Sequence, residues 1–140
     1  MGAQEMKPDD FMGAWRLVRW EQIEDGEPIG KFPMGEDAEG LIIYEPGGHM
    51  SGFLSRAGWK DMDPSLESYN IDFFAYGGTW RIDGNRVEHH VQFASFPRWI
   101  GGTQVRHATL KDGYLILEVP ESSSAAPDGP RKFRLTWERP

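Results

Sequence analysis

The sequence predicts an all-β fold, a single domain in which about eight antiparallel strands close into a barrel. Three observations support this. Turn-forming residues are abundant, with 17 Gly and 10 Pro among 140 residues, and they recur at short intervals. Strand-like runs lie between them. The chain also carries 6 Trp, 4 Tyr and 8 Phe, which suits a bulky interior. Closing a small sheet into a barrel removes its exposed edges.

Turn signals delimit the predicted strands. Asp25-Gly26, Asp83-Gly84 and Asp112-Gly113 supply the positive φ that tight hairpins require, and further turn signals fall at 46–48, 77–78, 101–102 and 127–130. In chain order, the predicted strands cover residues 14–22, 40–45, 49–54, 75–82, 86–94, 102–110, 114–119 and 132–138.

Three segments depart from the strand pattern. Asp63 is a good N-cap residue and Pro64 suits the first helical position, so a short helix is expected near residues 64–74. Residues 1–10 are expected to form an N-terminal arm, and residues 7–11 favour a helical turn before the first strand. Residues 121–130 are rich in Ser, Ala and Pro and predict a flexible loop. With no repeat or linker in view, residues 1–140 are expected to form one domain.

Composition excludes several classes of function. The formal net charge is −7, without a basic run, which disfavours nucleic-acid binding. The absence of Cys excludes disulfides and thiolate chemistry. No apolar run could span a membrane. The polar, acidic segment 1–10 does not resemble a signal peptide, so a cytoplasmic location is expected.

Both ends of the predicted barrel carry a recognisable pattern. The first strand opens with Gly13-Ala14-Trp15, and Arg139 follows the last strand. Lipocalins have a G-x-W and a terminal Arg in these places, with the Arg stacked on the Trp. Such a pair combines a cation–π contact with donors that tie down the chain ends.

The middle of the chain extends this resemblance. The segments that carry it are 32–44, 48–51, 76–80, 87–91, 97–101, 104–106 and 135–139. From about Phe11 to Arg139, the sequence resembles the lipocalin-like domain family of small, mostly microbial proteins. The resemblance implies a lipocalin-type barrel with an internal cavity. It leaves function open, because binding proteins and biosynthetic-cluster members share this fold.

Strand alternation suggests which side chains face inward. In the strand at 86–94, one face carries Val87, His89, Val91 and Phe93 and is the more apolar, so it should point into the barrel. This places His89 inside and His90 outside. A bulge would reverse the two, so both remain candidate catalytic residues, and a simple core role for His89 remains the alternative.

The next strand is ambiguous. If the face with Ala108 and Leu110 points inward, Gln104 and Arg106 enter the barrel as candidate ligand-binding and catalytic residues. A buried guanidinium would then need an acidic partner, water, or an anionic or carbonyl-bearing ligand. The alternative for Arg106 is a salt bridge at the barrel mouth.

Aromatic residues supply a candidate pocket lining. Tyr44, Tyr76, Trp80 and Trp99 offer large amphipathic surfaces of the kind that contact small organic ligands. The alternative is that they simply fill the barrel. His49 follows a Gly-rich turn and is a further ligand-binding candidate at a barrel rim.

The chain lacks the signatures of cofactor-dependent chemistry. Adjacent His89 and His90 point to opposite faces and cannot share one ion, and no H-x-H or H-E-x-x-H occurs. Nucleotide-binding glycine motifs and G-x-S-x-G are also absent. We therefore expect neither a metal nor an organic cofactor.

The sequence favours a barrel that binds a small hydrophobic or aromatic molecule bearing a polar oxygen. The alternative is a cofactor-independent isomerase, cyclase, dehydratase or lyase. In that enzyme His89 would act as acid or base, with a Tyr or a carboxylate such as Asp72 nearby, and Arg106 would hold an enolate or carboxylate. A third alternative is an interaction module with a filled barrel. A homodimer stays open, and neither nucleic acid nor a membrane is expected as a partner.

Overall fold

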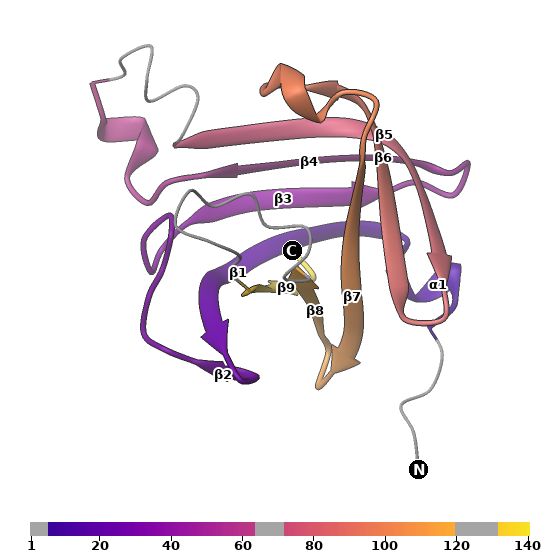
Figure 1. Ribbon diagram of the computed structural model, residues 1–140, viewed down its shortest axis with the longest axis horizontal. Coiled ribbons are helices and arrows are strands. Elements are labelled where there is room, and N and C mark those ends of the chain that lie inside the picture. Colours follow the sequence, from indigo (N-terminus) through magenta and orange to yellow (C-terminus); the bar gives the residue numbers. More distant parts are fainter. Residues whose placement is uncertain (1–5, 64–71, 120–131) are drawn as a thin grey trace.

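The structure is a computed structural model that describes residues 6–63, 72–119 and 132–140. These residues form one sheet of antiparallel strands in the order β2-β1-β3-β4-β5-β6-β7-β8-β9, closed by pairing of β1 with β9 (Figure 1). The strands are β1 (Gly13–Glu24), β2 (Glu27–Pro28), β3 (Glu39–Tyr44), β4 (His49–Ser55), β5 (Phe73–Asp83), β6 (Arg86–Ala94), β7 (Thr103–Lys111), β8 (Tyr114–Val119) and β9 (Lys132–Glu138). The predicted eight-stranded barrel is thus confirmed, with β2 added as a short extension beside β1.

Local turn chemistry explains most strand boundaries. Every predicted strand matches an observed one to within about two residues at each end. The Asp25-Gly26 and Asp112-Gly113 turns have the positive φ expected of tight hairpins. Gly77-Gly78 is not a turn, because it lies inside β5.

Some predicted elements lie outside the described residues. Most of the helix predicted over 64–74 falls there, but Phe73 and Phe74 begin β5 rather than ending a helix. The predicted loop at 121–130 and residues 1–5 of the N-terminal arm also lie outside. The helical turn expected at the end of that arm is present as α1 (Pro8–Phe11).

The predicted contact between the two ends of the barrel is present. The Arg139 guanidinium lies 3.7 Å from the centroid of the Trp15 ring, and its Nη1 donates a hydrogen bond to the Ala14 carbonyl at 3.1 Å. Gly13 has a φ of +101°, and a Cβ there would lie 3.0 Å from the same Nη1. The glycine of the motif therefore provides both the backbone geometry and the space for the arginine.

Helix α1 closes one end of the barrel. Its Phe11 is fully buried and packs edge-on against Tyr44, with ring centroids 5.6 Å apart, and against Trp80 at 6.0 Å. Trp15 Nε1 donates to the Phe11 carbonyl at 2.8 Å. The Met6 N–H donates to the side chain of Asn85, which agrees with the position of α1 beside the β5–β6 turn in Figure 1. This end is filled by side chains.

A β-bulge changes which residues of β6 face inward. The register between β5 and β6 shifts between Gly77 and Gly78, so Gly78 pairs with Val91 and Gly77 with Phe93. Val91 is buried, as predicted, but Phe93 is 73% exposed because the bulge turns it outward. A Cβ on Gly78 would lie 1.9 Å from a backbone carbonyl oxygen of β6, so this close approach requires glycine.

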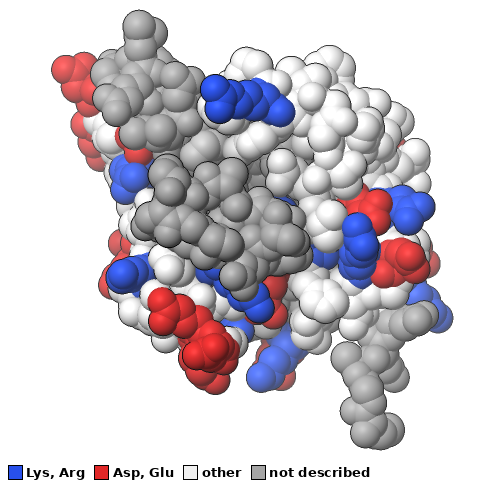
Figure 2. Space-filling model, viewed as in Figure 1, with Lys and Arg blue, Asp and Glu red and all other residues white. Residues whose placement is uncertain are grey.

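Charged residues lie mainly on the outer surface. On the face drawn in Figure 2, acidic and basic side chains are interspersed. Two ion pairs of this kind link Glu88 to Arg81 and to Arg86. In the part of the chain that the structure describes, no helix has the length and apolar character needed to cross a membrane.

Candidate functional site

The barrel encloses a cavity of about 500 Å³. Its lining is mostly aromatic and aliphatic, and consists of Trp20, Ile42, Gly52, Phe53, Leu54, Phe74, Tyr76, His89, Trp99, Gln104, Arg106, Leu117, Val119, Phe133, Leu135 and Trp137. The cavity extends to the end of the barrel opposite α1, where Phe74, Val119 and Phe133 lie near the ends of their strands. One end of the barrel is therefore packed and the other is hollow.

Trp99 lies at the hollow end. It belongs to the short 3₁₀ helix η2 (Pro97–Trp99), and its ring lies 5.5 Å from that of Phe74 and 5.9 Å, edge-on, from that of Tyr76. Gly52 is paired with Tyr76 on the neighbouring strand and also lines the cavity. Gly52 has no side chain, so the backbone of β4 itself lines the cavity here, and a Cβ at this position would lie 3.2 Å from the Ile42 side chain.

Strand β7 brings two polar side chains into the cavity. Gln104 and Arg106 lie on the same face as Ala108, which is buried, and this resolves the ambiguous alternation of the strand. Gln104 is paired with His89 and Arg106 with Val87 on β6, so the polar residues of the two strands are neighbours on the inner face. Arg106 is half-buried, and its Nη1 donates to the Val105 carbonyl at 2.8 Å. Among the described residues it has no carboxylate partner.

A hydrogen-bonded chain of three side chains borders the cavity. The Tyr44 hydroxyl lies 2.7 Å from Nε2 of His89, and the Tyr76 hydroxyl lies 2.6 Å from Nδ1 of the same ring. Tyr44 is 0% exposed and His89 is 1% exposed. Tyr76 and His89 line the cavity, whereas Tyr44 lies behind them against the packed end. As the alternation predicts, His89 faces inward.

Burial sets the protonation states of Tyr44, His89 and Tyr76. It lowers the pKa of His89 to about 3, and the positive charge of nearby Arg106 acts in the same direction. His89 is therefore neutral at physiological pH. Burial also raises the pKa of Tyr44 and of Tyr76, and the charge of Arg106 opposes both shifts. Both tyrosines therefore keep their protons at physiological pH.

The cavity lining is rich in hydrogen-bond donors. The indole N–H groups of Trp20 and Trp137 are buried and have no acceptor among the described residues. With Arg106, Gln104 and Tyr76 they place five donor side chains around one apolar space, and no Asp or Glu of the described residues joins the lining. Buried donors without acceptors are unfavourable. The arrangement suits a bound group that accepts hydrogen bonds.

Several sequence candidates lie away from the cavity. Tyr44 and Trp80 pack against each other, with ring centroids 5.0 Å apart, in the closed end below the cavity lining. Strand alternation predicts which face of the sheet a residue lies on, but not its position along the barrel axis. Tyr44 and Trp80 both face inward, but they lie at the end of the barrel that α1 closes. His90 is exposed on the outer face. Asp72 is buried and binds Arg56 instead, with 2.6 Å between Oδ1 and Nε.

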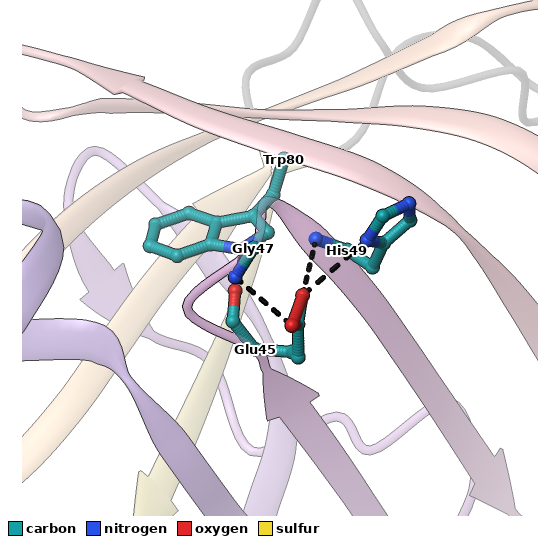
Figure 3. A network of polar contacts seen from close by, with 4 residues as sticks. All are labelled: Glu45, Gly47, His49 and Trp80. Carbon is teal, nitrogen blue, oxygen red and sulfur yellow. Dashed lines mark hydrogen bonds and ion pairs between the residues drawn. The ribbon is translucent and has the colours of Figure 1, made fainter.

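His49 is the first residue of β4, next to the turn at 46–48, and its side chain lies on the outside of the barrel. The carboxylate of Glu45 accepts hydrogen bonds from the backbone N–H groups of Gly47, at 2.9 Å, and His49, at 3.2 Å, and it contacts His49 Nδ1 at 3.3 Å (Figure 3). These backbone hydrogen bonds lower the pKa of Glu45. Trp80 Nε1 donates to the Glu45 carbonyl. The His49 side chain is 70% exposed and stabilises the turn rather than lining the cavity.

Other lining residues were not predicted. Alternation in β8 and β9 could have identified Leu117, Leu135 and Trp137, which follow the period of two expected for an inward face. Trp20 is different, because the register of β1 against β9 shifts between Leu17 and Arg19. This irregularity changes the face that later residues of β1 present, and no local signal marks it.

Comparison with known proteins identifies the family of the chain. No curated protein matches the chain in sequence. Among solved structures, one titled "REP1-NXSQ fatty acid transporter" is similar with a TM-score of 0.45 and 15% sequence identity, over 94% of this chain and 97% of that one. The profile described as "Lipocalin-like domain" matches residues 12–140, which includes both the Gly13–Trp15 motif and Arg139. The chain therefore belongs to the lipocalin-like domain family.

Proposed function

We propose that this barrel binds a small, largely apolar organic molecule whose oxygen acceptor, a carboxylate, an enolate or a carbonyl, lies at Arg106. One observation carries the proposal. A half-buried guanidinium without a carboxylate partner among the described residues lies in the wall of an apolar cavity of about 500 Å³.

The size and lining of the cavity suit a small ligand. Binding sites for such molecules typically occupy about 300–1,000 Å³ and combine apolar walls with a few polar groups that fix orientation. Here the walls are aromatic and aliphatic, and the polar groups gather on β5, β6 and β7, around Tyr76, His89, Gln104 and Arg106. An elongated or fused-ring molecule would place its apolar body against Phe74, Phe133 and other side chains of the hollow end.

The charge of the site favours an oxygen acceptor. A guanidinium in an apolar wall is costly unless a charged or strongly polar partner satisfies it. Hydrogen bonds from Arg to an anionic oxygen are among the stronger ones available in proteins. Because the lining contributes no carboxylate of its own among the described residues, the ligand is the natural source of the partner.

A matched pair of fluorescent probes tests the proposal. 1-Anilinonaphthalene-8-sulfonate is an aromatic anion, and N-phenyl-1-naphthylamine has the same ring system without the sulfonate. We expect both to bind the purified protein with a 1:1 stoichiometry. Arg106→Met should weaken binding of the anion by about tenfold or more, because a charge-assisted hydrogen bond is lost, and should change the affinity for the neutral probe by less than about twofold.

Lys111→Met provides the control. Lys111 lies on the same strand as Arg106 but is exposed, so this variant makes the same change in net charge outside the cavity. It should bind both probes like the parent protein. If neither probe binds, or if both variants weaken the anion equally, the proposed site is wrong.

Cofactor-independent catalysis is a second candidate. The observation that favours it is the Tyr44–His89–Tyr76 chain beside Arg106, which places a proton-bearing hydroxyl and a cation at one cavity wall. Enolisation of a bound cyclic ketone would then be accelerated, with a solvent water taking the α-proton while the Tyr76 hydroxyl and Arg106 stabilise the enolate oxygen. Incubation of 2-tetralone with the protein in D₂O, followed by mass spectrometry, would detect deuterium at its α-carbons. Exchange at the background rate, or equal exchange with His89→Ala and Arg106→Ala, would argue against an enzyme of this kind.

A further inference from the structure

The direction of the hydrogen bonds in the Tyr44–His89–Tyr76 chain determines what Tyr76 can offer a ligand. This inference deepens the proposed function and rests on it. Each imidazole nitrogen lies within hydrogen-bond distance of one tyrosine hydroxyl. A neutral imidazole has one N–H donor and one acceptor nitrogen, so one tyrosine must donate to the ring and the other must accept from it.

Tyr44 must donate its proton to His89, because accepting a hydrogen bond from the ring would leave the Tyr44 O–H without an acceptor. Its hydroxyl is fully buried, and His89 Nε2 is its hydrogen-bond partner among the described residues. If Nε2 carried the proton, the Tyr44 oxygen would accept it and the Tyr44 O–H would have no acceptor. An unsatisfied buried hydroxyl is unfavourable by about 1–3 kcal/mol.

The opposite arrangement satisfies Tyr44 and both ring nitrogens of His89. Tyr44 donates to Nε2, the Nδ1–H of His89 donates to the Tyr76 oxygen, and the Tyr76 O–H remains free. Tyr76, unlike Tyr44, lines the cavity. Its remaining proton can therefore point into the cavity, where a ligand oxygen can accept it.

We infer that the buried Tyr44–His89 pair holds Tyr76 as a fixed hydrogen-bond donor to the ligand oxygen, so that the site selects molecules with an acceptor and disfavours those with a donor at this position. Tyr76 is then the specificity-determining residue. His89 and Tyr44 act through it as positioning residues. Arg106, a cation in the same cavity lining, reinforces the same preference.

The direction of the hydrogen bonds between His89 and the two tyrosines can be measured without a ligand. Long-range ¹H–¹⁵N correlation of protein labelled with ¹⁵N-histidine distinguishes protonated from unprotonated ring nitrogens, and His89→Gln assigns the His89 signals. We expect His89 to carry its proton on Nδ1 alone. A proton on Nε2, or an even mixture of both forms, would overturn the inference whether or not the protein binds a ligand.

The donor role of Tyr76 can be tested with a probe whose fluorescence depends on hydrogen bonding to its carbonyl. Prodan, 6-propionyl-2-dimethylaminonaphthalene, carries one ketone acceptor and emits at longer wavelength when that ketone accepts a hydrogen bond. Tyr76→Phe should weaken prodan binding by about fivefold, the value of one neutral hydrogen bond. It should also shift the emission of bound prodan to shorter wavelength. The affinity for N-phenyl-1-naphthylamine, which lacks the ketone, should change by less than about twofold.

The control is Tyr114→Phe, which removes a hydroxyl from an exposed tyrosine on β8 and should leave both probes unaffected. Unchanged prodan affinity and emission in Tyr76→Phe would refute the donor role even if Arg106→Met behaves as proposed. If no probe binds at all, the proposed function fails, and the protonation of His89 still decides the direction of the chain.

Discussion

His89 should make the protein less stable in mild acid. Its pKa is lowered from 6.5 to about 3 by burial and by the charge of Arg106, so the folded protein cannot protonate it while the unfolded chain can. The unfolded state therefore binds one more proton below pH 6.5. The stabilisation is fully present above that pH and is lost progressively as pH falls toward the folded pKa.

The size of the effect follows from the two pKa values. At pH 5 the unfolded imidazole is almost fully protonated and the buried one is almost fully neutral. This difference lowers the free energy of unfolding by about 2 kcal/mol relative to pH 8. Comparison with a variant that lacks His89 isolates this contribution from those of the other titratable groups.

Urea unfolding followed by tryptophan fluorescence at pH 8 and pH 5 measures this loss. His89→Gln should lack this contribution. Between pH 8 and pH 5 its free energy of unfolding should therefore fall by about 2 kcal/mol less than that of the parent. His90→Gln is the matched control, because His90 is the next residue but is exposed on the outer face, and it should behave like the parent. Equal acid sensitivity in His89→Gln and the parent would refute the assignment of a buried neutral imidazole.

Three further substitutions test other parts of the account. Arg139→Met removes the cation–π contact with Trp15 and the bond to the backbone and should lower the free energy of unfolding by about 1 kcal/mol, whereas unchanged stability in urea would show that the pair is dispensable. Gly78→Ala places a Cβ 1.9 Å from a backbone oxygen and should destabilise the fold by about 3 kcal/mol or more. A normal unfolding midpoint would contradict the bulge. Gly52→Val fills space beside Ile42, where even a Cβ would lie 3.2 Å from the nearest atom, and should weaken N-phenyl-1-naphthylamine by about fivefold or more. Unaltered affinity would place that probe elsewhere.

Local sequence signals were sufficient for the barrel but not for its irregularities. Asp-Gly turns and alternating strands are short-range features, so they define the strands and the inward position of His89. The outward turn of Phe93 was not predictable, because it depends on how β5 and β6 pair at Gly78. A bulge is a property of two strands, and one strand's sequence does not contain it.

The candidate site was predictable in part for the same reason. Tyr76 was a candidate because of its aromatic ring, and Arg106 because one of the two possible faces of its strand would carry it inward; the structure places both in the cavity lining. The separation of the interior into a packed end and a hollow end was not predictable, because it depends on the docking of Phe11 against Trp80. That contact joins residues far apart in the chain, and it assigns Tyr44 to the core.

The most direct test of the central claim is a crystal structure of the protein with bound 1-anilinonaphthalene-8-sulfonate. The account predicts that the naphthalene ring occupies the cavity between Phe74 and Phe133, with the sulfonate within hydrogen-bond distance of Arg106. A probe bound on the outer surface instead, for example against the exposed Phe93, with the barrel interior filled by the protein's own side chains, would contradict it.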